Sequence, residues 1–215
     1  MLELFERGGI MMYPLTFASV LALVIIVERF FTLRKKKIII PEIIAIVEQF
    51  NSLKDVDLAR NICLKFNGPL PNLIKTGLDN ANLSRVDVKE LIEDQGRQEI
   101  RELEKGLIIL ETIAVISPLL GLLGTVLGMT RVFGVIKEQG IGQAAALSGG
   151  ISEALLTTVT GLFIGIPVLI FFNYFAKKAE NFVLDIEKYS NFLIQKLHSI
   201  KEKPEYISEE QSPKI

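Results

Sequence analysis

The chain has 215 residues, of which 49% are hydrophobic and 23% are charged. Its formal net charge of −1 gives no basis for nucleic-acid binding, and its single cysteine and single histidine exclude an intrachain disulfide and a Cys/His metal cluster. Such an apolar sequence with so many charges indicates long apolar blocks that alternate with polar ones.

Three stretches are long enough to cross a membrane. Residues 8–27, 112–130 and 154–176 contain no charged side chain, and a spanning helix needs about 20 mostly apolar residues. One such run could be a buried helix of a soluble protein, but three of them favour an integral membrane protein with three transmembrane helices. The basic residues follow the first run instead of preceding it, so we expect this run to remain as an anchor and not to be a cleaved signal peptide.

Lysine and arginine predict the orientation, because they concentrate on the cytoplasmic flanks of spans. They cluster at 34–37 after the first run, at Arg101 and Lys105 before the second, and at Lys177 and Lys178 after the third. We therefore expect the N-terminus outside and the C-terminus in the cytoplasm.

The chain then divides into six segments of an all-α protein. They are a segment outside the membrane with the first transmembrane helix (1–34), a cytoplasmic helical region (35–105), the second transmembrane helix (106–134), a short periplasmic link (135–150), the third transmembrane helix (151–176), and a cytoplasmic helix with a disordered tail (177–215).

The cytoplasmic region carries its own start and stop signals. Gly68 to Pro71 interrupts a helical apolar pattern, and Ser84 with Asp87 three residues later resembles a capping box that opens a new helix. No stop signal separates that helix from the second span, so we expect one long helix to continue across the membrane boundary. The third span is likewise expected to continue as a long helix.

The second span carries a row of small residues. Gly121, Gly124 and Gly128 share one helix face, which allows another helix to approach closely in lipid. Pro118 predicts a kink, because it removes one helix hydrogen bond. Thr125 needs a partner for its hydroxyl, either the carbonyl one turn back or a polar cavity. The run is not a phosphate-binding loop, since no lysine precedes the threonine.

The third span contains one carboxylate, Glu153, which is the only charged residue between Glu138 and Lys177. A charge in hydrocarbon is costly, so it normally faces a cavity or a partner. Counting 20 residues back from the end of the apolar run leaves Glu153 about one turn, roughly 5 Å, outside the core, where it could simply cap the helix. Other polar or small residues lie on the same or adjoining faces: Thr157, Thr158, Thr160, Gly161 and Gly165.

Two motifs resemble those of one family. Pro118–Met129 (PLLGLLGTVLGM) and Gly150–Thr158 (GISEALLTT) resemble the second- and third-span signatures of the ExbB/TolQ/MotA family. The pairs Glu28-Arg29 and Ile166-Pro167, with Asn173, also fit the pattern, and the resemblance covers residues 10–180. Gly149 stands where the ExbB pattern often has proline. MotA-type proteins have four spans, so the chain resembles ExbB and TolQ more closely.

The resemblance implies the pore-forming subunit of an ion-driven motor in the inner membrane. It implies a homopentamer, a dimer of a single-span ExbD/TolR-like partner in the central pore, and action on a TonB/TolA-like protein. The ion-carrying aspartate of the family belongs to the partner. The matching residues of this chain would line the ion pathway: Thr125, Glu153, Thr157 and Thr158. No cofactor is implied.

Two other classes stay open. The chain could be a secondary transporter subunit, although it lacks an internal inverted repeat. It could also be a non-conducting membrane scaffold held together by its glycine faces. An enzyme is not expected, because no motif assembles a nucleophile with a base. The residues leave open whether H⁺ or Na⁺ is used, and whether import, envelope maintenance or motility is powered.

Overall fold

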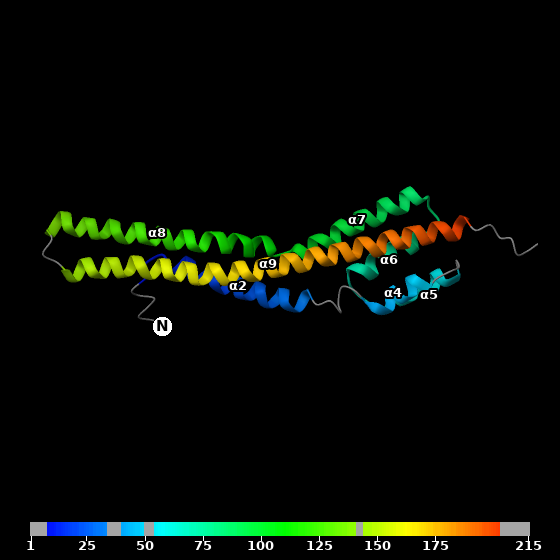
Figure 1. The fold of residues 1–215 in the computed structure, drawn as a ribbon, viewed down its shortest axis with the longest axis horizontal. Helices are drawn as coiled ribbons and strands as arrows, with labels where there is room; N and C mark the ends of the chain where they lie inside the picture. Colours follow the sequence, from blue (N-terminus) through cyan, green and yellow to red (C-terminus); the bar gives the residue numbers. More distant parts are fainter. Residues whose placement is uncertain (1–7, 34–39, 50–53, 141–143, 203–215) are drawn as a thin grey trace, which may run out of the picture. The chain divides into compact units, whose positions relative to one another are not determined.

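The computed structural model describes residues 8–33, 40–49, 54–140 and 144–202, and over these residues the only regular structure is α-helix (Figure 1). The all-α prediction is therefore confirmed. The helices are α2 (Met12–Thr32), α4 (Pro41–Gln49), α5 (Lys54–Cys63), α6 (Pro69–Asp79), α7 (Arg85–Glu104), α8 (Leu107–Gln139) and α9 (Ala144–Glu202).

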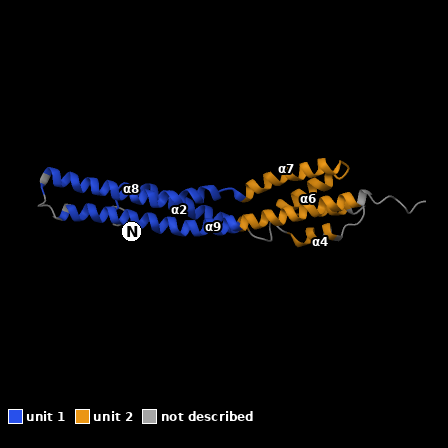
Figure 2. Cartoon of the chain, turned by 45° about the horizontal axis from the view of Figure 1, so that its top comes forward, with its two compact units in different colours: residues 1–31, 104–177 blue, residues 32–103, 178–215 orange. Residues whose placement is uncertain are grey.

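The chain forms two compact units, coloured separately in Figure 2. Unit 1 comprises residues 1–31 and 104–177, and unit 2 comprises residues 32–103 and 178–215. Within the described residues, the structure has three helices that are long and apolar enough to cross a membrane. They are α2, the stretch that contains α8, and α9, which confirms the three predicted spans.

The helix boundaries differ from expectation at two places. The stretch from Arg85 to Glu138 is long, as expected, but α7 ends at Glu104 and α8 begins at Leu107. Gly106 lies between them with φ of +78°, a left-handed conformation that glycine adopts without strain. The helices also extend into the segment expected as a link, since α8 continues to Gln139 and α9 begins at Ala144. The basic cluster at 34–37 and the expected disordered tail at 203–215 lie outside the described residues.

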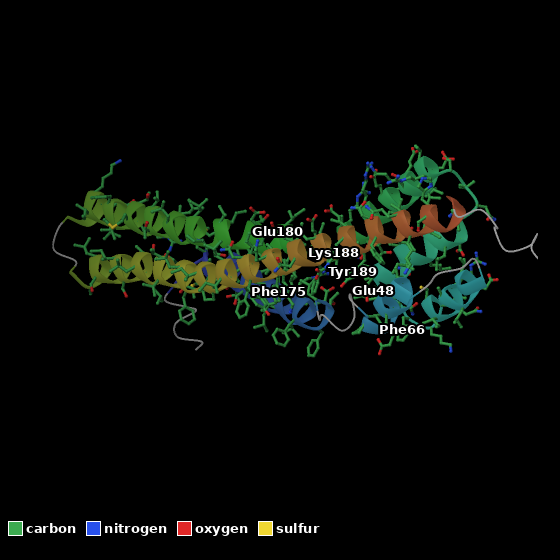
Figure 3. The ribbon with its side chains drawn as sticks, turned by 45° about the vertical axis from the view of Figure 1, so that its right-hand side comes forward. Glu48, Phe66, Phe175, Glu180, Lys188 and Tyr189 are labelled. Atoms are coloured by element: carbon green, nitrogen blue, oxygen red, sulfur yellow. The ribbon has the colours of Figure 1, made fainter. Side chains whose placement is uncertain are left out.

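In unit 1, α2 packs along α8 and the first part of α9. Ile25 of α2 lies against Gly106, where a methyl group on the glycine would be 3.3 Å from Ile25 Cγ2. The 21 residues of α2 span about 31 Å at 1.5 Å per residue, close to the ~30 Å thickness of a bilayer's hydrocarbon core. Phe175 of α9 is fully buried, and its ring lies 5.3 Å from that of Tyr174 and 6.3 Å from that of Phe171 (Figure 3).

The outside of unit 1 is strongly apolar. Many large apolar side chains are exposed on all three helices, which suits hydrocarbon or partner helices around them and not water. They include Tyr13, Phe17, Val20, Leu23 and Val24 on α2, Val115, Leu119, Leu122 and Val126 on α8, and Leu155, Val159, Phe163, Ile166 and Ile170 on α9.

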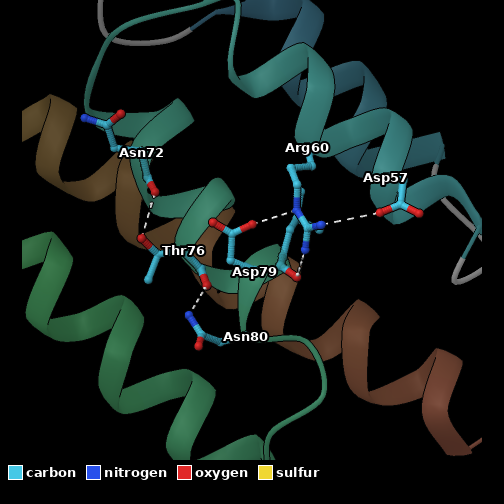
Figure 4. A network of polar contacts seen from close by, with 7 residues as sticks. Asp57, Arg60, Asn72, Thr76, Asp79 and Asn80 are labelled. Carbon is cyan, nitrogen blue, oxygen red and sulfur yellow. Dashed lines mark hydrogen bonds and ion pairs between the residues drawn. The ribbon is translucent and has the colours of Figure 1, made fainter.

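In unit 2, polar contacts connect α5 with α6 (Figure 4). Arg60 of α5 forms an ion pair with Asp79 of α6 at 2.6 Å between Nε and Oδ1, and also contacts Asp57 at 3.4 Å. Its Nη2 donates to the carbonyl oxygen of Leu78. One guanidinium therefore joins the two helices at two points, Asp79 and the Leu78 carbonyl, and also contacts Asp57 within α5.

Apolar packing holds α6 against α7 and α9 within unit 2. A methyl group at Gly77 would lie 2.7 Å from Leu193 Cδ2 and 2.9 Å from Ile92 Cδ1, so no larger residue fits there without movement. Lys196 of α9 donates to the carbonyl oxygen of Glu48 in α4. Figure 3 also marks Lys188 and Tyr189 on α9, where the ammonium lies 5.5 Å from the ring centroid.

Ser84 caps the start of α7, as the sequence predicted, and the Asp87 carboxylate bonds to the serine hydroxyl and not to the backbone N–H of a full capping box. The backbone N–H of Asp87 donates to Ser84 Oγ at 3.2 Å, and the hydroxyl itself donates to the Asp87 carboxylate at 2.8 Å. The serine hydroxyl thus satisfies one N–H that the first turn leaves without a helical partner.

A first prediction concerns Cys63. Burial, together with the negative charge of Asp79, raises the pKa of its thiol to about 11. Because the thiolate is the reactive form, we expect a soluble maleimide to modify Cys63 at neutral pH much more slowly than a cysteine introduced at exposed Asn67. The rate should rise as pH approaches 11. Since the unfolded chain loses this proton at lower pH than the folded one, alkaline pH should also destabilise unit 2. Equal rates at the two positions at neutral pH would contradict the burial.

Candidate functional site

The central feature of unit 1 is a close contact between the antiparallel helices α8 and α9, which lie side by side in Figure 1. A methyl group at Gly161 would lie 2.5 Å from the carbonyl oxygen of Ser117 and 3.1 Å from the Cα of Gly121. One at Gly121 would lie 2.9 Å from the carbonyl oxygen of Thr157. The two backbones therefore touch at these glycines, as small residues permit in membrane helices. We call this contact the α8–α9 seam.

The seam continues toward the C-terminal end of α8 and the N-terminal end of α9. The side chain of Thr157 fills the space over Gly124, and a methyl group at Gly128 would lie 2.9 Å from Ala154 Cβ. Thr157 is 1% exposed, and its hydroxyl donates to the carbonyl oxygen of Ala154 at 2.8 Å. Thr157 therefore packs within the seam, and its expected place along the ion pathway stays a prediction.

At the opposite end of the seam, Gly165 packs against Pro118. A methyl group at Gly165 would be 2.8 Å from the proline ring and 3.1 Å from the carbonyl oxygen of Ala114. This carbonyl is the one that Pro118 deprives of its helical N–H donor. Both α8 at Pro118 and α9 at Pro167 remain helical. The kink predicted at Pro118 stays a prediction.

Two threonine hydroxyls lie along one edge of the seam. Thr158 of α9 donates through Oγ1 to the carbonyl oxygen of Gly121 in α8 at 3.1 Å, a hydrogen bond between the two helices. Thr125 follows Gly121 by one turn on α8, is half-buried, and donates to the carbonyl oxygen of Leu122 at 2.6 Å. These hydroxyls are the polar side chains of this edge, which we call the threonine edge.

Glu153 lies on the other edge of the seam. Its carboxylate pairs with Arg131 of α8 at 2.5 Å between Oε1 and Nη1, and its side chain is 22% exposed. The segment that precedes α2 covers it, because a side chain at Gly9 would occupy the space of the carboxylate. Glu153 lines a small pocket together with Gly8, Ile10, Met11, Gly124, Leu127, Arg131 and Thr157.

The residues that the sequence assigns to one ion pathway lie at different places around the seam, and their role in ion movement stays a prediction. At 100° per residue, Thr158 lies about 140° around α9 from Glu153. Thr125 and Thr158 lie on the threonine edge, Glu153 lies beneath α2 on the opposite edge, and Thr157 is buried between them.

The contact with Gly9 also indicates the depth of Glu153 along the span. Gly9 precedes the first residue of α2 by three positions, and α2 alone is about as long as the hydrocarbon core is thick. Glu153 therefore lies level with the N-terminal end of α2. At the other end of α2, Arg29 is 2% exposed and donates to Glu28 at 3.1 Å.

Sequence reasoning missed the partner of Glu153. Neither Arg131 nor Gly9 was singled out from the sequence. A useful signal was present: Arg131 and Glu153 are the charged residues nearest to the ends of two apolar runs that an antiparallel hairpin brings together. Within the described part of the chain, no group of histidine, cysteine or carboxylate side chains could hold a metal ion.

Fold and site together define an integral membrane protein with three apolar helices, two of them in backbone contact beside polar side chains. The sequence model of the MotA/TolQ/ExbB proton channel family matches residues 65–188, more than half of the chain. The chain therefore belongs to the MotA/TolQ/ExbB proton channel family, and the proposed resemblance is confirmed.

Individual relatives agree with this assignment. An ExbB homolog of Methanothermobacter thermautotrophicus is 28% identical, over 86% of this chain and 66% of its own length. ExbB-like protein 3 of Synechocystis sp. is 32% identical, over 78% of this chain and 81% of its own. The biopolymer transport protein exbB1 of Vibrio cholerae is 31% identical, over 78% and 75%. The match thus spans just under two thirds of the length of the Methanothermobacter protein.

A second prediction tests the seam. Gly161→Ala should destabilise unit 1 by about 1–3 kcal/mol, the usual cost of overpacking, because the backbone carbonyl of Ser117 cannot move away as a side chain could. Gly134→Ala on α8 is the matched control, since nothing lies within 4 Å of the added methyl group. Thermal unfolding of the purified protein in nanodiscs measures the difference. Equal melting temperatures for the two variants would mean that the helices do not touch at Gly161.

Proposed function

We propose that the chain is the pore-forming subunit of an ion-driven motor in the inner membrane. It would couple the flow of protons, or of sodium ions, to mechanical work on a partner and thereby energise import or maintain the envelope. Support comes from membership of a proton channel family and from relatives named as biopolymer transport proteins.

The observation that carries this proposal is the threonine edge. Burying a hydroxyl group in hydrocarbon costs free energy unless the group forms a hydrogen bond. The hydroxyls of Thr125 and Thr158 each donate one to a backbone carbonyl oxygen. Each hydroxyl keeps lone pairs with which it can accept a hydrogen bond from water or coordinate a passing cation. An apolar surface with two such groups along one edge suits transient contact with an ion, and not permanent binding.

The exposed apolar side chains of unit 1 leave room for further helices in the membrane. We propose that copies of this chain form a ring, a homopentamer as in the family pattern, around a dimer of a single-span ExbD/TolR-like partner. That partner would carry the ionisable aspartate, and a TonB/TolA-like protein would receive the work. In this arrangement the threonine edge faces the partner.

A non-conducting scaffold is the second candidate, and a specific observation favours it. Thr157, Gly161 and Gly165 are all accounted for by helix packing. A scaffold, however, has no need for the hydroxyl of Thr158 beyond one hydrogen bond, and substitutions that preserve packing should then preserve function.

A third prediction concerns topology. In a Cys63→Ser background, we expect a membrane-impermeant maleimide to label Glu138→Cys on intact cells and to label Asn67→Cys only after the membrane is opened. Both positions are exposed in their own units, and basic residues concentrate on the predicted inner flanks. Labelling of both from the same side would overturn the three-span topology.

A fourth prediction separates motor from scaffold. Thr158→Val keeps the shape of the side chain and removes its hydroxyl, so it should abolish energy-dependent function at normal membrane abundance. Glu153→Ala should do the same, and Thr125→Val should weaken function. Thr160→Val is the matched control, because the Thr160 hydroxyl donates within α9 to Leu156 at 2.8 Å and makes no contact with α8 among those described.

The measurement is an uptake or growth assay alongside quantified membrane protein. Near-normal activity of both Thr158→Val and Glu153→Ala would remove the main reason to assign an ion pathway to this chain.

A further inference from the structure

The ion pair of Arg131 and Glu153 is more than a surface contact. At 2.5 Å the guanidinium and the carboxylate form a charge-assisted hydrogen bond, and the carboxylate is 22% exposed while the arginine is 55% exposed. The pair joins α8 to α9, two helices whose residues here are 22 positions apart in sequence. Among the described residues, Glu153 forms its ion pair with Arg131.

The surroundings of the pair fix which way the carboxylate points. Gly9 lies directly against the carboxylate, and its φ of +65° is one that a larger residue rarely adopts. Leu127 and Met11 line the same small pocket as Glu153. Glu153 is therefore held beneath α2, on the side of the seam away from Thr125 and Thr158.

The ion pair also changes the charge that Glu153 presents to a mobile cation. An isolated carboxylate at the membrane boundary attracts cations, but one that is paired with a guanidinium has no net charge to offer. The tethered arginine takes the position that a mobile cation would otherwise occupy. An ion could use Glu153 only when the pair opens, since the same oxygen cannot serve both cations at full strength.

We propose that Arg131 is a positioning residue that holds and neutralises the Glu153 carboxylate on the α2 side of the α8–α9 seam, so that Glu153 takes part in ion movement only when this pair opens. This inference rests on the proposed function for its consequence in transport, but the pairing itself can be tested without transport.

The geometric test is a zero-length cross-link in the full-length protein, purified in nanodiscs. A water-soluble carbodiimide activates the carboxyl group, and the amine of Arg131→Lys attacks it. An amide bond forms between α8 and α9, and the carbodiimide takes up the water as a urea. We expect mass spectrometry to find a peptide pair joining positions 131 and 153.

Two controls make the cross-link specific. The native Lys137 lies on the same end of α8 and should not couple to Glu153. Thr130→Lys introduces the same amine one residue away, on another face of the helix, and should not couple either. Coupling of Thr130→Lys as efficiently as Arg131→Lys, or no coupling of Arg131→Lys in protein that is folded, would overturn the inference.

The functional test compares Arg131→Gln with Arg131→Lys at matched membrane abundance. We expect Arg131→Gln to lower the energised rate about tenfold or more, the size expected when a charged hydrogen bond is lost, and Arg131→Lys to restore most of it. A double-mutant cycle read out by melting temperature supplies a measurement besides activity. Arg131→Gln should lower the melting temperature of the native protein, and it should have little further effect on the Glu153→Gln variant.

The outcomes separate the two proposals. Full activity and an unchanged melting temperature for Arg131→Gln would overturn the positioning role even if the cross-link forms. Normal activity of Glu153→Ala and Thr158→Val would instead refute the ion pathway, while the cross-link and the double-mutant cycle would still report on the pair.

Discussion

The backbone contact between α8 and α9 is the constraint on which the rest of unit 1 depends. Helices in lipid gain little from the hydrophobic effect, so close packing and interhelical hydrogen bonds must hold them together. Gly121 and Gly161 allow the two backbones to touch. Only at this separation can the hydroxyl of Thr158 reach the carbonyl oxygen of Gly121, and only then does Thr157 fill the space over Gly124.

This contact also gives the helix pair two edges with different chemistry. One edge carries two threonine hydroxyls, each satisfied by a carbonyl and each able to accept another hydrogen bond. The other carries a paired charge covered by the segment that precedes α2. Neutral hydroxyls can lie within an apolar surface at modest cost, whereas a carboxylate at the membrane boundary needs a counter-ion. The hydroxyls and the ion pair lie on different edges because a buried hydroxyl costs less free energy than a buried charge.

The family match extends beyond the two packed helices. It covers residues 65–188, which includes α6 and α7 of unit 2 as well as the seam. In unit 2 the ion pair of Arg60 with Asp79 joins α5 to α6, and apolar contacts at Gly77 join α6 to α7 and α9.

The sequence by itself determined the class of the protein, since three uncharged runs of about 20 residues can only be satisfied by spanning helices. The sequence also identified the small-residue face of α8 and the serine cap of α7, because each of these features depends on residues that are close together along the chain. Only the tertiary structure decided that Gly106 interrupts the helix before the second span, and that Thr158 and Glu153 lie on different edges. It alone revealed that Arg131 pairs with Glu153 beneath Gly9. Residues that are 22 or more positions apart meet through the angle and register of packed helices, which local periodicity does not specify.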